Sequence, residues 1–129
     1  MDKKDKGSVQ SMVEGGLTAG LPAALIYATY PTHEAALEHG RRLVEAGLAG
    51  CVNILAGMTA VYVWNGQTET AGEAVLMAKL SPERIPEAVE FLRAAHPYET
   101  PAILVLPVVG GNAAYLDWVR AGCRGNGPA

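Results

Sequence analysis

The stretch Val61-Tyr62-Val63-Trp64-Asn65-Gly66-Gln67 decides the fold of this chain. Four residues that favour strands run directly into Asn-Gly, and both residues of this pair tolerate the positive φ of a two-residue type I′ turn. The return strand is predicted over residues 67–80. If the turn has two residues and no bulge intervenes, Tyr62 lies opposite Glu69. A long β-hairpin is therefore the centre of the predicted structure.

The segment before this hairpin predicts a strand followed by a helix. Residues 24–29 form a short apolar run that ends at Pro31, which is typical of a buried strand. Thr32 can cap the next helix, whose apolar residues recur at three- and four-residue spacing. The first strand of the hairpin is predicted over residues 51–64, with a bend or bulge at Ala56-Gly57.

The segment after the hairpin repeats the pattern of a helix and a strand. Ser81-Pro82-Glu83 combines a capping hydroxyl, a proline at the first helical position and an acid that favours the helix dipole. Residues 102–109 predict a further buried strand, and Asn112 can cap a last short helix. The order β-α-β-β-α-β, followed by this C-terminal helix, predicts an α+β ferredoxin-like sandwich.

The length of 129 residues fits one domain with its own core. We expect this domain to span residues 23–123, between a flexible N-terminal tail over 1–22 and a flexible C-terminal tail over 124–129. The N-terminus lacks the apolar core of a signal peptide. We therefore expect a cytoplasmic protein in which Cys51 and Cys123 are reduced thiols.

The composition excludes two classes of partner and indicates a third. A net charge of −3 and a pI near 5.5 give no basic surface for nucleic acid. No apolar run approaches the ~18 residues of a membrane span, so no membrane contact is expected. Only 18% of the residues are charged, which is low against the ~25% that is usual for soluble domains. This balance favours burial of apolar surface in an oligomer.

The segment His96-Pro97-Tyr98-Glu99-Thr100-Pro101 is the main candidate for a functional site. Each proline fixes its own φ and keeps the preceding residue out of the helical region, so the corner is stiff and extended. An imidazole, a phenol and a carboxylate held in set directions are typical of a binding loop. The alternative is a helix stop that happens to contain a histidine.

Other chemically active residues are fewer. Cys51 is either a small core residue or, if the fold brings His96 or a carboxylate within reach, a ligand in a copper or zinc site. Glu73 and Lys79 lie six apart on one strand and share a face, either as a charge pair or as rim charges. His33 and His39 are expected to face solvent. No catalytic triad, P-loop or dinucleotide-binding turn is present, so we do not expect an enzyme.

Several of these motifs together resemble the CutA family of divalent-cation tolerance proteins. The resemblance covers about residues 24–123, and its motifs occur in the order found in that family. They are Cys51-Val52-Asn53-Ile54, Tyr62-Val63-Trp64-Asn65-Gly66, Glu73 to Lys79, His96-Pro97-Tyr98-Glu99-Thr100-Pro101, Leu106-Pro107-Val108 and Tyr115-Leu116-Asp117-Trp118.

The resemblance implies a homotrimer of ferredoxin-like protomers, similar in architecture to PII signalling proteins, that is associated with copper tolerance and the response to metal ions. It places a set of polar residues, His96 and Cys51 among them, in clefts between subunits, and these two residues are the candidate metal ligands. In this chain the cleft residues would be Trp64, Glu73, Lys79, Tyr98, Glu99 and Trp118. No cofactor is expected with certainty, and a divalent metal such as copper is the candidate.

This chain also departs from the pattern of the family. A described copper site uses a cysteine at the end of the first strand and two adjacent histidines, and here Ala28 and Ala95 occupy two of those positions. Only His96 of that set remains, and one imidazole does not make a selective copper site. The alternative function is a PII-like sensor that binds a small anionic ligand in the inter-subunit cleft.

Overall fold

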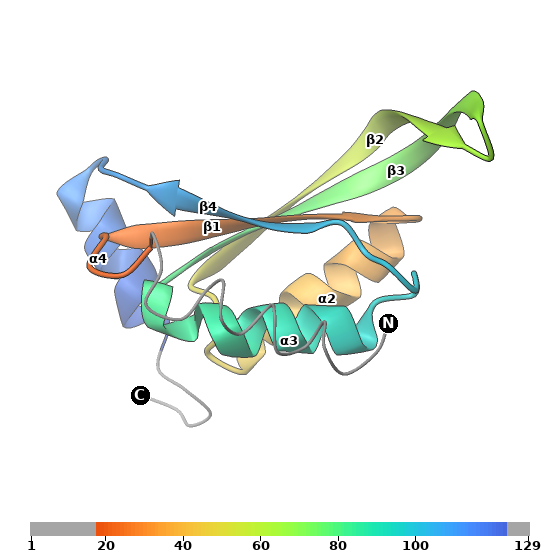
Figure 1. Cartoon of the computed structure of the whole chain (residues 1–129). Helices are drawn as coiled ribbons and strands as arrows, with labels where there is room; N and C mark the ends of the chain where they lie inside the picture. Colours follow the sequence, from red (N-terminus) through yellow and green to blue (C-terminus); the bar gives the residue numbers. More distant parts are fainter. Residues whose placement is uncertain (1–17, 124–129) are drawn as a thin grey trace.

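The computed structural model describes residues 18–123 and shows an antiparallel sheet with two helices on one face and a third at one end of the sheet (Figure 1). The elements are β1 (Ala23–Tyr30), α2 (His33–Glu45), β2 (Cys51–Trp64), β3 (Gln67–Leu80), the short 3₁₀ turn η1 (Pro82–Arg84), α3 (Ile85–Ala95), β4 (Ile103–Val108) and α4 (Ala113–Ala121). The sheet order is β2-β3-β1-β4. The predicted ferredoxin-like α+β fold with an added C-terminal helix is confirmed. Most of the two predicted tails lies outside the described residues.

The core lies between the sheet and the two helices α2 and α3. Alternate residues of β1 point into it, because successive side chains of a strand face opposite ways. Ile26 and Tyr30 are fully buried there, and Leu76 and Leu80 of β3 lie on the same face. The helices contribute Leu43, Ile85 and Leu92. This one-sided burial fixes which residues of every strand remain on the other face of the sheet.

The hairpin of β2 and β3 has the predicted turn and register. Asn65 and Gly66 adopt φ values of 52° and 76°, as a type I′ turn requires, and Tyr62 pairs with Glu69. The register shifts between Leu55 and Met58, so the bulge predicted at Ala56-Gly57 is confirmed. Gly57 has a φ of 80°, which a glycine adopts without strain. Beyond the bulge the hairpin projects past the rest of the sheet (Figure 1).

Two of the three predicted helix caps form. The side-chain oxygens of Thr32 and Asn112 accept hydrogen bonds from Ala35 N and Ala114 N at 3.1 Å each. Ser81 precedes η1 without a side-chain cap. Its backbone N–H instead donates to Cys123 Sγ at 3.4 Å, which ties the start of η1 to the end of α4.

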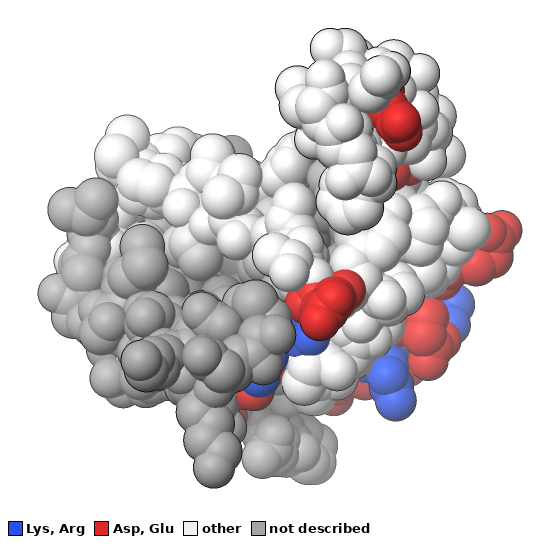
Figure 2. Space-filling view, turned by 45° about the vertical axis from the view of Figure 1, so that its right-hand side comes forward, with Lys and Arg blue, Asp and Glu red and all other residues white. Residues whose placement is uncertain are grey.

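The face of the sheet opposite α2 and α3 is largely apolar, and no helix of residues 18–123 runs along it. Its residues alternate with the core residues and include Leu25 and Tyr27 of β1, Met77 of β3, and Leu104 and Leu106 of β4. We call this surface the open face. Leu104 is 58% exposed and Leu106 42% exposed. The projecting hairpin is likewise almost free of charge, whereas most charges in the same view gather on the lower part of the molecule (Figure 2).

Candidate functional site

His96 lies where the sequence predicted a positioned histidine, immediately after α3 and before the proline corner. Its ring is 8% exposed, and both of its nitrogens have partners. Nε2 lies 2.7 Å from the carbonyl oxygen of Thr29, and the backbone N–H of Tyr98 donates to Nδ1 at 3.1 Å. A carbonyl can only accept and an amide N–H can only donate, so the two contacts define a neutral imidazole with its proton on Nε2.

The surroundings of His96 favour this neutral form. Burial lowers the pKa of the ring, while the hydrogen bond to Thr29 O and the charge of Glu73 oppose that shift. The ring also stacks on Tyr30, with ring centroids 4.3 Å apart, and lies 5.0 Å from the ring of Tyr98. His96 therefore links the end of β1 to the proline corner.

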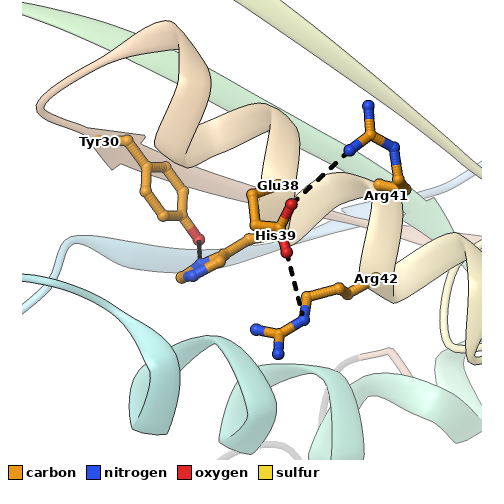
Figure 3. A network of polar contacts seen from close by, with 5 residues as sticks. All are labelled: Tyr30, Glu38, His39, Arg41 and Arg42. Carbon is orange, nitrogen blue, oxygen red and sulfur yellow. Dashed lines mark hydrogen bonds and ion pairs between the residues drawn. The ribbon is translucent and has the colours of Figure 1, made fainter.

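His39 is buried, contrary to the prediction that it faces solvent. It is 7% exposed, and its Nδ1 is hydrogen-bonded to the hydroxyl of Tyr30 at 2.9 Å (Figure 3). Burial lowers its pKa first, and His96 and Arg42 lower it further. The signal in the sequence was the spacing, since position 39 falls three residues after Ala36 and belongs to the apolar stripe of α2. Because histidine is a polar residue, this spacing was not interpreted as a sign that His39 is buried.

The outer face of α2 carries charged side chains. Glu38 lies 3.6 Å from both Arg41 and Arg42 in exposed ion pairs (Figure 3). Arg42 also lies over the ring of Phe91, 5.7 Å from its centroid. Exposed pairs of this kind contribute little to stability, ~0.2–1 kcal/mol, and they do not form a site.

Tyr98 and Glu73 meet at the middle of β3. The Tyr98 hydroxyl donates to Glu73 Oε2 at 2.8 Å. Burial and this hydrogen bond raise the pKa of Tyr98 to about 12. The contact holds the proline corner against the hairpin. Glu99, next in the chain, is exposed.

Lys79 belongs to a different cluster, at the end of the sheet beside α4. Its Nζ donates to the Tyr115 hydroxyl at 3.0 Å and lies 5.3 Å from the centroid of the Tyr115 ring. That ring stacks on Trp118, with centroids 5.8 Å apart. Cys51, a free thiol, pairs with Lys79 across the β2–β3 ladder.

The predicted cleft residues do not converge within one chain. Glu73 and Lys79 lie six residues apart on β3, roughly 20 Å at 3.3 Å per residue, and each has its own tyrosine partner. Trp64 pairs with Gln67 at the hairpin tip, and its side chain is 62% exposed. That these groups meet in clefts between different chains stays a prediction.

The residues of one chain do not fit a copper or zinc ion. Within residues 18–123, no group of three or more His, Cys, Asp or Glu side chains could hold a metal ion. Cys51 lies two strands across the sheet and four residue pairs along it from the contact of His96 with Thr29, roughly 16 Å away. His96 has both nitrogens engaged, and Ala28 is a fully buried methyl group. A metal site that includes Cys51 would require ligands beyond those of residues 18–123, and one that includes His96 would also require that ring to give up a hydrogen bond.

Fold and site together define a class of protein. It is a small ferredoxin-like α+β protein with a projecting hairpin, an open sheet face and a proline corner that His96 and Tyr98 hold in place by hydrogen bonds. Sequence comparison matches residues 24–122 to the CutA1 divalent ion tolerance protein family. The chain belongs to this family.

Relatives and solved structures agree with this assignment. The chain is 40% identical over 96 residues to the divalent-cation tolerance protein CutA of Thermus thermophilus, a match covering 74% of this chain and 93% of the relative. It is 39% identical over 94 residues to human protein CutA, covering 73% of this chain but only 52% of the human protein. The crystal structure of the divalent ion tolerance protein CutA1 from Ehrlichia chaffeensis superimposes with a TM-score of 0.78 at 30% identity, covering 82% of this chain and 99% of that one.

Proposed function

We propose that this protein acts as a cytoplasmic homotrimer in the tolerance of divalent cations, copper among them, without catalysing a reaction. The observation that carries the proposal is the family match over residues 24–122, together with relatives named for divalent-cation tolerance. The fold supports it, because every motif that carries the family resemblance lies within the described domain, either on a helix or strand or in the turn and the corner that join them.

The open face supports the homotrimer. A largely apolar sheet face is costly to leave in water, and closed symmetry covers such a surface without leaving a growing end. Both cysteines within residues 18–123 are free thiols, as in a reducing compartment. No helix among these residues is long and apolar enough to cross a membrane.

The role in tolerance does not require a metal ion bound tightly by one chain. The neutral, doubly bonded His96 and the distant Cys51 do not form a chelating pair. Any metal bound by the assembly would use groups from more than one chain, with Cys51 available on the open face. We expect at most weak copper binding by the purified protein.

A growth assay tests this function directly. In a bacterial strain that lacks its own CutA and grows poorly in copper, the chain should restore growth in Cu²⁺ while an empty vector does not. Equal growth of the two strains at every copper concentration, with the chain expressed and folded, would overturn the proposal. Native mass spectrometry of the same preparation should show three chains of 13.5 kDa each.

A further inference from the structure

We draw no further inference here: the strongest candidate, the apolar groove between α2 and the edge strand β2 that is lined by Leu37, Val44, Val52 and Ile54, carries none, because nothing in the described part of the chain shows what covers it.

Discussion

At the scale of single residues, His96 connects β1 to the proline corner by hydrogen bonds. Its two nitrogens play opposite roles, one donating to Thr29 O and one accepting from Tyr98 N. Protonation of Nδ1 would place two donors face to face and break the second contact. The ring therefore holds the corner only in its neutral form.

This arrangement predicts a loss of stability in acid. Burial lowers the pKa of both His39 and His96, so the unfolded chain binds more protons than the folded one below pH ~6.5. The stabilisation is complete above the unfolded pKa and is lost as the pH falls from there towards the folded values. We expect the Tm, measured by circular dichroism, to fall between about pH 7 and pH 5.

Two variants separate these rings from other acid-sensitive groups. His96→Gln should lower the Tm at neutral pH and make its dependence on pH shallower. His33→Gln removes an exposed histidine at the start of α2 and should leave the profile unchanged. A profile that flattens in His33→Gln, or that stays unchanged in His96→Gln, would contradict the assignment.

Residue types were enough to predict the position of His96 but not the burial of His39. The two prolines showed that His96 is held in a set direction, and the structure places it between Thr29 and Tyr98. The burial of His39 was missed because a polar residue at a position of the apolar stripe was expected to face solvent. Its partner, the Tyr30 hydroxyl, comes from another element, and the sequence does not show which buried groups meet across elements.

At the scale of elements, Gly50 permits α4 to pack against the start of β2. A Cβ at this position would lie 2.3 Å from the backbone oxygen of Val119 and 2.9 Å from its Cα. These are backbone atoms, so they cannot move aside as a flexible side chain would. We expect Gly50→Ala to destabilise the domain by at least ~1–3 kcal/mol, measured by urea unfolding.

Gly72→Ala is the matched control for Gly50→Ala. Gly72 lies in β3, and a Cβ there would meet nothing within 4 Å. The substitution should leave stability unchanged or raise it by up to ~1 kcal/mol, since glycine weakens a strand interior. Equal effects of the two substitutions would show that the contact with Val119 is unimportant.

The elements with local signals were predictable from the sequence. The Asn65-Gly66 turn, the bulge and the caps at Thr32 and Asn112 depend on neighbouring residues, and all of them form. The expected cap at Ser81 does not form. Instead its backbone bonds Cys123, a contact 42 residues away in the sequence, which no local pattern contains.

At the scale of the whole molecule, the open face predicts that assembly depends on its apolar side chains. Leu104 is 58% exposed in one chain, and Leu104→Glu would place a carboxylate where the proposed neighbouring chain packs. Light scattering at micromolar concentration should show three chains for the wild type and a shift to single chains for this variant.

The same substitution on the helix layer serves as a control. Leu37 lies on α2 and is 38% exposed, so Leu37→Glu changes charge and apolar area without touching the open face. It should remain trimeric. A monomeric wild type, or a Leu104→Glu variant that assembles as well as Leu37→Glu, would contradict an interface on the open face.

The order of elements was enough to predict the topology of residues 18–123. The resemblance places Glu73, Lys79 and Trp64 in clefts between subunits, which stays a prediction, and in one chain they lie at the middle, one end and the far tip of the hairpin. The contact of Lys79 with Tyr115 exists because α4 returns to the end of the sheet, a long-range arrangement that residue spacing does not encode.

The bulge in β2 also determines the sidedness of the projecting arm. Between the pairs Leu55–Val75 and Met58–Glu73, β2 advances by three residues and β3 by two. Side chains alternate along a strand, so one extra residue shifts the phase of everything beyond it. Tyr62 and Trp64, at even positions, consequently share the side of Glu73 instead of continuing the even-numbered core face of Val52 and Ile54. A single residue of chain length, and not the composition of the arm, directs its two large aromatic rings.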